Sequence, residues 1–331
     1  MLSNKNIVCP ENLLNIAKEK GPVKAVIVNA VKKVTIESAK QAVEANLITP
    51  LFVGDKSIIE KISKEMNWDI SKYEIVHEPD ENSTAPIAAK LASEGKAKII
   101  VKGHIHTDVL MKAVLKRDLN LIGKKRLSHV WHMTLEKNDK PFIITDGALN
   151  VLPKLETKMH ILKNSVDFAN RIGIEKPKVS ILSATEEVLE SVPSSKDAEE
   201  LTKLAKKENL NADVFGPLAF DNSISKKSAT IKGIKNSVAG EADVPLVPSV
   251  EAGNALVKMM IYFMGACAAG VVIGGKVPVV ITTGTFPPTT TPAAQAPIKK
   301  IIILTKPLPA STFGTKRISV FPATTLSLIH I

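Results

Sequence analysis

Aliphatic runs alternate with amphipathic segments along the first half of the chain. Residues 23–30, 50–54 and 97–103 carry apolar runs, rich in Ile and Val in the first and third, which is typical of strands buried on both faces of a sheet. The segments between them, such as 34–46 and 83–95, repeat apolar residues at helical spacing. This βαβα rhythm predicts a mainly parallel sheet covered by helices.

A second cycle of the same kind follows two apolar runs, 127–133 and 140–146, which we expect to pair because no long helix separates them. The pattern then predicts a helix at 155–173, a strand at 178–184, a helix at 196–208, a loop at 215–225, a strand at 242–248, a helix at 253–265 and a strand at 269–275. The fold class is therefore α/β, with two doubly wound domains.

The domain boundary is predicted near residues 141–150, and a last strand, 277–283, is expected to return to the first sheet. The first domain is then 1–140 plus about 273–283, the second is 141–272, and 284–331 forms an atypical tail. In such sheets ligands bind beyond the carboxyl ends of strands. The loops after the strands at 97–103, 140–146, 178–184, 242–248 and 277–283 should thus converge on one cleft.

The composition fits a folded globular protein, with 44% hydrophobic and 23% charged residues among 331. The formal charge is +11, but the lysines mostly alternate with Glu along helical segments such as 56–66, and five basic residues lie in 284–331. No basic face that would bind nucleic acid is indicated. A mild preference for anionic ligands is the most that the charge implies.

The two cysteines, Cys9 and Cys267, lie far apart, so neither a disulfide framework nor a zinc site is indicated. The first residues lack the apolar region of a secretion signal, and the apolar run 269–281 is interrupted by Gly, Lys and Pro. We therefore expect a cytoplasmic protein that does not span a membrane.

The segment GHIHT, residues 103–107, joins a predicted strand to a predicted helix. Gly103 ends the strand, and Thr107 or the next residue can cap the helix, which leaves backbone N–H groups for an anion. Helix-end electrostatics contribute only about 0.3–1 kcal/mol at exposed sites, so a side chain such as Lys112 would have to assist. This pattern favours a phosphate pocket.

Two other interpretations of GHIHT are less favoured, the metal site least of all. His104 and His106 could be structural histidines, or they could bind a metal, although no HExxH motif or carboxylate cluster supplies further ligands. We therefore predict no metal site.

Two later turns carry polar residues beside glycines. Asp221 and Asn222 follow a Gly-Pro turn and could cap a helix or bind substrate; alone, they favour a cap. Gly253 and Asn254 begin a predicted helix, where a glycine allows a ligand to come close.

Together, the motifs VKGHIHTDVLMKAVLKRD, LSHVWHM, FIITDGALN, GPLAFDNSIS and VPSVEAGNALVKMM resemble the phosphate acetyltransferase and phosphate butyryltransferase family over about residues 20–283. The resemblance implies two α/β domains of the isocitrate/isopropylmalate dehydrogenase type around a cleft for coenzyme A and acyl phosphate. It also implies reversible transfer of an acyl group from acyl-CoA to phosphate by direct attack in a ternary complex. Coenzyme A is then a substrate, and neither a covalently bound cofactor nor a metal is expected.

The resemblance also suggests roles for single residues. Gly103, His106, Thr107 and Lys112 would face the phosphate or coenzyme A, whereas His104 matches no fixed family position. Gly253 and Asn254 would line the opposite wall, and Asp221 and Asn222 are further candidates for substrate binding. A homodimer is implied, as is functional pairing with an acetate or butyrate kinase, and the overall resemblance favours acetyl over butyryl.

The chain departs from the family after the predicted last strand. The family continues there with Ser-Arg and then an Asp that acts as base, whereas this chain has Thr283 at the Ser position, Gly284 at the Arg position and no acidic residue after Glu251. Loss of a base costs on the order of 10²–10⁴ in rate, and loss of an oxyanion donor about 10²–10³. We interpret 284–331 as a non-native ending that impairs catalysis; a genuine flexible linker is the alternative.

Two other functions are kept as alternatives. A dehydrogenase on the same fold is disfavoured, because the sequence has no GxGxxG fingerprint and no carboxylate set for a divalent metal. A non-catalytic protein that binds coenzyme A would use the same cleft without turnover.

Overall fold

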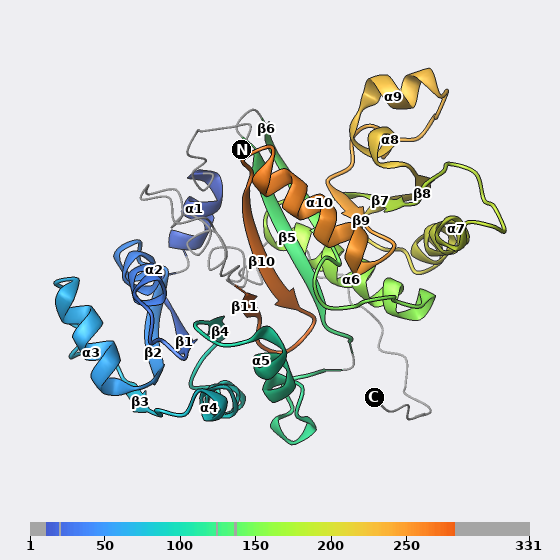
Figure 1. The fold of residues 1–331 in the computed structure, drawn as a ribbon. Coiled ribbons are helices and arrows are strands. Elements are labelled where there is room, and N and C mark those ends of the chain that lie inside the picture. The colour runs from blue at the N-terminus through green and yellow to red at the C-terminus, as the bar shows by residue number, and fades with distance from the viewer. Residues whose placement is uncertain (1–10, 20, 124, 136–137, 282–331) are drawn as a thin grey trace.

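A computed structural model of the protein describes residues 11–19, 21–123, 125–135 and 138–281. The fold is mixed α/β and is built on one eleven-stranded sheet in the order β3-β2-β1-β4-β11-β10-β5-β6-β9-β7-β8 (Figure 1). No helix within these ranges has the length and apolar character needed to cross a membrane.

Apart from β8, the strands follow the predicted aliphatic runs. They are β1 Val23–Val28, β2 Ile48–Gly54, β3 Ile75–His77, β4 Ile99–Lys102, β5 Ser128–Leu135, β6 Asn138–Thr145, β7 Lys178–Leu182, β8 Asp213–Leu218, β9 Val244–Leu246, β10 Cys267–Ile273 and β11 Val279–Ile281.

The helices lie between them in the sequence. They are α1 Glu11–Lys18, α2 Lys33–Glu44, α3 Lys56–Glu65, α4 Glu81–Ser93, α5 Thr107–Val114, α6 Leu155–Arg171, α7 Pro193–Lys207, α8 Phe220–Ile224, α9 Lys226–Ile231 and α10 Val250–Tyr262, with a 3₁₀ turn at Arg117–Leu119.

The sheet has a parallel part at each end and an antiparallel centre. Strands β3, β2, β1, β4 and β11 are parallel to one another, as are β6, β9, β7 and β8. Between them, β10 is antiparallel to β11 and to β5, and β5 is antiparallel to β6. The expected pairing of the runs 127–133 and 140–146 is thereby confirmed.

Helices cover both faces of the sheet. On one face, α4 and α5 pack in a cluster that includes Val272 of β10, and α10 packs in a second cluster that includes Ala268 of the same strand. Because alternate residues of a strand share a face, these three helices lie on the same side. The opposite face packs against α2, α6 and α7 in a third cluster, which includes Val271.

The expectation of a loop at 215–225 is wrong. This segment contains the end of β8 and all of α8. The Gly-Pro pair that suggested a turn lies in the outermost strand of the sheet, where proline is tolerated because one side of the strand has no ladder to complete.

The predicted domain boundary falls across the end of β6 and the loop that follows it, and the sheet continues without interruption on both sides of that strand. The last described strand, β11, pairs with β4 of the first half of the chain.

Candidate active site

The backbone at the end of β1 holds the turn after β4 in place. A Cβ atom on Gly103 would lie 2.1 Å from the Val28 carbonyl oxygen, so only glycine fits. Asn29 Nδ2 donates to the His104 carbonyl oxygen at 2.5 Å, and the His104 N–H donates to the Asn29 carbonyl oxygen at 3.1 Å. The two strand ends therefore fix the start of the 103–107 turn.

His106 is the N-cap residue of α5, and its side chain makes no capping hydrogen bond. It is exposed, and Thr107, which is half-buried, begins the helix. Gly103, His106 and Thr107 thus lie together at one turn, with the first amides of α5 beside them.

Lys112 lies on the exposed side of α5. Its side chain is 80% exposed and its Nζ is 3.7 Å from Asp108 Oδ2, one helical turn earlier. The helix therefore directs Lys112 to solvent and to Asp108, and this position does not favour the expected contact with a phosphate.

The loop after β6 is organised by Asp146. Its buried carboxylate accepts hydrogen bonds from the backbone N–H groups of His129 (3.0 Å), Ala148 (3.0 Å) and Leu149 (2.9 Å), and from Asn150 Nδ2 (2.6 Å). Four donors compensate the cost of burying this group. Asp146 thus fixes the shape of the loop.

The first turn of α10 packs against this loop. A Cβ atom on Gly253 would lie 2.8 Å from Gly147 Cα and 3.0 Å from the Asp146 carbonyl oxygen. The Val250 N–H donates to the Val151 carbonyl oxygen at 3.0 Å. Gly253 therefore allows the close contact between helix and loop, and Asn254 follows it in an exposed position.

His129 of β5 is a buried histidine that the sequence analysis did not single out. Neither ring nitrogen has a hydrogen-bond partner among the described residues, and its ring centroid is 4.7 Å from that of Trp131. Burial lowers the pKa of His129 to about 4, against the opposing charge of Asp146. The imidazole is therefore neutral at pH 7.

His129 belongs to a set of residues in mutual contact on the sheet face. A Cβ atom on Gly270 would lie 2.8 Å from the His129 ring and 2.9 Å from Trp131, and one on Gly147 would lie 2.9 Å from Trp131. We call this strip, made of His129, Trp131, Asp146, Gly147 and Gly270, the seam. Its Trp131 belongs to the cluster under α10, and the cluster under α5 covers the same face of the sheet.

One continuous row of paired residues crosses the sheet beneath the seam. It runs through Val101, Val280, Val271, Val130, Thr145 and Leu246. Gly103 follows Val101 by two residues, and Gly147 follows Thr145 by two residues. Because β4 and β6 run in opposite directions, the two glycines lie on opposite sides of the row.

The five strands whose loops were expected to converge on one cleft therefore do not all end at the same edge of the sheet. Three antiparallel pairings separate β11 from β6, so β4 and β11 end on one side of the row, whereas β6 and β9 end on the other. The 103–107 turn and the Gly147–Gly253 contact flank the row from opposite sides.

The two candidates in α8 have different surroundings. Asn222 is fully buried, and its Nδ2 donates to Glu186 Oε1 at 2.5 Å, which connects α8 to the segment after β7. Asp221 is exposed, and its carbonyl oxygen accepts from the Ser225 N–H at 2.8 Å. The N-cap residues of α8 and α9 are Ala219 and Ser225, so the helix cap that the sequence favoured for Asp221 and Asn222 is wrong.

Thr283, the candidate at the family Ser position, lies outside the described residues. Ile281, two residues before it, ends β11 beside β4.

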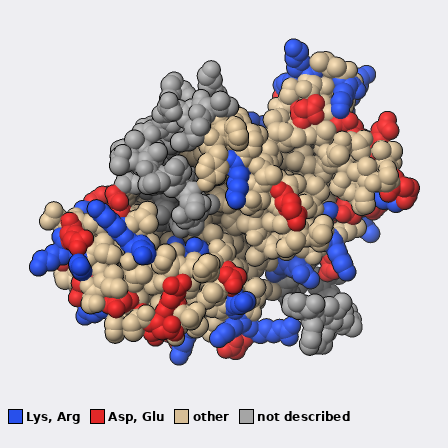
Figure 2. Space-filling model, in the orientation of Figure 1, with Lys and Arg blue, Asp and Glu red and all other residues tan. Residues whose placement is uncertain are grey.

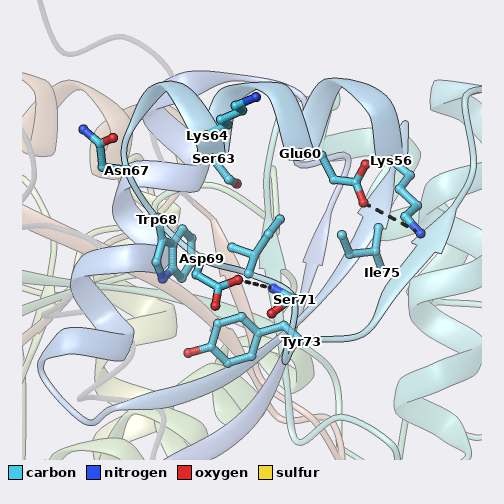
Figure 3. Close-up of a pocket in the computed structure, with 11 residues that line it drawn as sticks. Lys56, Glu60, Ser63, Lys64, Asn67, Trp68, Asp69, Ser71, Tyr73 and Ile75 are labelled. Atoms are coloured by element: carbon cyan, nitrogen blue, oxygen red, sulfur yellow. Dashed lines mark hydrogen bonds and ion pairs between the residues drawn. The ribbon is translucent and has the colours of Figure 1, made fainter.

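A separate cavity of about 680 Å³ lies beneath α3 at the outermost strand, β3, and is lined by Trp68, Tyr73 and Lys64 among others (Figure 3). None of the predicted site residues lines it. Strands β2 and β1 separate β3 from β4 in the sheet, so this cavity is not part of the seam.

Charged side chains of both signs are mixed on the surface in view, as Figure 2 shows, with Lys and Arg interspersed among Asp and Glu. Within the described ranges, no three His, Cys, Asp or Glu side chains come close enough together to hold a metal ion.

The comparisons with known proteins agree with one another. The model of the family described as phosphate acetyl/butaryl transferase matches residues 79–285. A phosphate acetyltransferase of Rickettsia felis is 38% identical over 268 residues, which cover 80% of this chain and 77% of that protein. A phosphate butyryltransferase of Clostridium beijerinckii is 34% identical and covers 82% of this chain and 91% of that protein.

A solved structure gives the same result. The crystal structure of a branched-chain phosphotransacylase from Enterococcus faecalis matches with a TM-score of 0.73 and 29% identity, over 85% of this chain and 97% of that one. The chain belongs to the phosphate acetyltransferase and butyryltransferase family of acyltransferases, which transfer an acyl group reversibly between coenzyme A and phosphate.

Proposed function

We propose that the family reaction takes place over the seam, with the 103–107 turn on one side and the Gly147–Gly253 contact on the other. The observation that carries this proposal is the continuous row from Val101 to Leu246, because it places both groups within two residues of one line across the sheet. Acyl-CoA, phosphate, acyl phosphate and free coenzyme A are the ligands. Coenzyme A is a substrate, and no bound cofactor takes part.

In the direction that forms coenzyme A thioester, the thiolate attacks the acyl carbonyl, the C–S bond forms, and the bond from carbon to the phosphate oxygen breaks. The thiol proton passes to a base, and phosphate leaves with the electron pair. A free thiol has a pKa near 8.5, so a base accelerates this step. The developing oxyanion needs hydrogen-bond donors, for which the amides at the start of α5 are candidates.

Acetyl is the favoured acyl group. The phosphate acetyltransferases of Rickettsia and Rhizobium are 37–38% identical to this chain, and the butyryltransferases of Clostridium are 34% identical. Release of coenzyme A from acetyl-, propionyl- and butyryl-CoA, followed with a thiol reagent, tests this preference. A higher kcat/KM for butyryl-CoA would overturn it.

The domain arrangement is proposed as isocitrate/isopropylmalate dehydrogenase-like. Residues 1–140 with about 273–283 form one domain, residues 141–272 form the other, and the substrate cleft lies between them. The pairing of β11 with β4 supports this division, because it connects the end of the described chain to the first half of the sheet.

Residues 284–331 are proposed to be a non-native ending that leaves the chain without the family Arg and Asp. The test compares the present chain with a version in which Ser-Arg is restored at positions 283–284 and the Asp a few residues later. We expect phosphate-dependent release of coenzyme A to rise by about 10²-fold or more on restoration. If the restored chain binds coenzyme A without turnover, the chain is a binding protein; if neither version binds, the proposed function fails.

A homodimer is proposed through the end of α10. Tyr262, Phe263 and Met264 are 38%, 59% and 43% exposed, and three such apolar side chains follow one another in the sequence. Beside them a cavity of about 500 Å³ is lined by Met259, Met260, Phe142 and Phe220. Phe263→Asp should convert a dimer to a monomer in sedimentation, and an unchanged mass would exclude this surface.

The same family context supports a cytoplasmic location and functional pairing with an acetate or butyrate kinase, which would consume the acyl phosphate. A coupled assay with such a kinase, following ATP formation from acetyl-CoA, phosphate and ADP, tests the pairing. Neither nucleic acid nor membrane is proposed as a partner.

A further inference from the structure

Lys102 is the last residue of β4, and its side chain lies on the face that α4 and α5 cover. Ile100 belongs to the cluster beneath these helices and Val101 to the cluster on the opposite face. Because strand side chains alternate between faces, Lys102 lies on the same side as Ile100. It is paired with Val28 of β1 and directly precedes Gly103.

The neighbouring strand ends at the same position. Val280 of β11 pairs with Val101, so Ile281 ends β11 next to Lys102. Ile281 belongs to the same cluster as Ile100, which places it on the same face. Lys102 is thus a cationic side chain at the junction of β4, β11 and the 103–107 turn.

The surroundings of Lys102 differ from those of a surface lysine. The residue is half-buried, and burial lowers the pKa of its ammonium group, against the opposing charge of Glu81 at the start of α4. A partly dehydrated ammonium group interacts more strongly with an anion than one in bulk water, because the effective dielectric constant is lower. Helix α5 begins five residues after Lys102, at Thr107, and the side chain of its N-cap residue, His106, makes no capping hydrogen bond.

We propose that Lys102 binds the phosphate group of inorganic phosphate and of acyl phosphate in this acyltransferase, and so is a substrate-binding residue. This inference rests on the proposed function. It replaces Lys112, whose side chain is 80% exposed and paired with Asp108, as the cation beside the turn. A lysine ammonium acts on phosphate as a point charge, so arginine at position 102 should partly replace it.

The test measures binding of inorganic phosphate to the full chain by the shift that phosphate causes in Tm. Lys102→Ala should weaken phosphate binding by on the order of 10- to 100-fold, as expected for loss of a hydrogen bond to a charged group. Lys102→Arg should retain most of the binding. Lys112→Ala is the matched control, and its phosphate response should equal that of the unaltered chain.

Coenzyme A provides the second readout. The Tm shift caused by coenzyme A should be retained in Lys102→Ala, and where turnover is measurable the KM for phosphate should rise while the KM for acyl-CoA stays within about threefold. Two results overturn the inference: phosphate binding by Lys102→Ala that equals the unaltered chain, or equal loss of phosphate and coenzyme A binding. Failure of the proposed function would differ, because the unaltered and restored chains would then release no coenzyme A.

Discussion

The buried imidazole of His129 makes stability depend on pH. Its pKa is about 4 in the folded chain and 6.5 in the reference state, so below pH 6.5 the unfolded chain takes up a proton that the folded chain refuses. The free energy of unfolding should therefore fall as the pH drops from about 6.5 to about 4, by on the order of 3 kcal/mol from this group.

His129→Gln isolates that contribution, because the amide does not titrate and the other histidines are unchanged. Urea unfolding at several pH values between 4 and 7 should give a shallower pH slope for the variant, whatever its stability at pH 7. Equal slopes for the two chains would show that His129 is not buried as a neutral group.

Gly253 is required by the contact between α10 and the loop after β6. Alanine there should lower the free energy of unfolding by about 1–2 kcal/mol, because its Cβ would meet backbone atoms of Gly147 and Asp146, although alanine favours the helix by about 1 kcal/mol. Gly123→Ala is the control, since a Cβ atom there has no neighbour within 4 Å. Denaturant unfolding measures both variants, and equal stabilities would contradict the tight contact.

The sequence identified these residues to different degrees. Gly103 could be predicted because a glycine between a strand and a helix has a local physical reason, whereas Gly253 lies in the first turn of α10 and was predicted to face a ligand rather than the loop after β6. His129 could not be predicted, because its burial depends on packing by Gly270 and Trp131, one of them about 140 residues away. Lys102 and Lys112 are chemically alike in the sequence, and only strand and helix geometry distinguishes the half-buried lysine from the exposed one.

At the scale of elements, α6 and α7 are connected by an ion pair whose two side chains differ in solvent exposure. Lys158 Nζ lies 2.7 Å from Asp197 Oδ2, and the lysine side chain is 7% exposed whereas the aspartate is 33% exposed. Asp197→Asn leaves a buried ammonium group without its counter-charge and should cost about 2–3 kcal/mol of unfolding free energy. Lys158→Met leaves an aspartate that water can reach and should cost less than about 1 kcal/mol.

The double variant completes the test by denaturant unfolding. With Lys158 already replaced, Asp197→Asn should have almost no further effect, because no buried cation remains to be neutralised. A larger cost for Lys158→Met than for Asp197→Asn would show that packing of the lysine stem, rather than its charge, dominates.

Helices and strands with a clear repeat of hydrophobic residues could be predicted from the sequence. Elements whose conformation depends on neighbouring strands in the sheet could not. The long helices and the Ile- and Val-rich strands form where the hydrophobic pattern places them. β8 was missed because Gly216 and Pro217 suggest a turn, and only a position at the sheet edge makes them compatible with a strand. Strand direction also escaped prediction, since the pattern of apolar residues is the same for parallel and antiparallel neighbours at the centre of a buried sheet.

At the scale of the whole molecule, the single sheet predicts that both halves unfold together. The two tryptophans report on different parts of the molecule. Trp68 packs with Phe52 near the outer strands, with ring centroids 6.0 Å apart, and Trp131 lies in β5 near the centre of the sheet. Trp68→Phe leaves Trp131 as the fluorescent probe, and Trp131→Phe leaves Trp68. In urea unfolding the two variants should show transitions with the same slope, and in each variant the fluorescence transition should coincide with that of far-UV circular dichroism. If the two probes depart from the backbone signal in opposite directions, the halves unfold separately.

The late position of β11 in the chain has a consequence for biosynthesis. Val280 must find Val101 across roughly 180 residues of intervening sequence, a separation that slows folding. Until the ribosome has released that segment, β4 has no neighbour on one side, and its unpaired backbone groups are open to association with other chains. A nascent chain would therefore depend on chaperones most strongly just before β11 emerges.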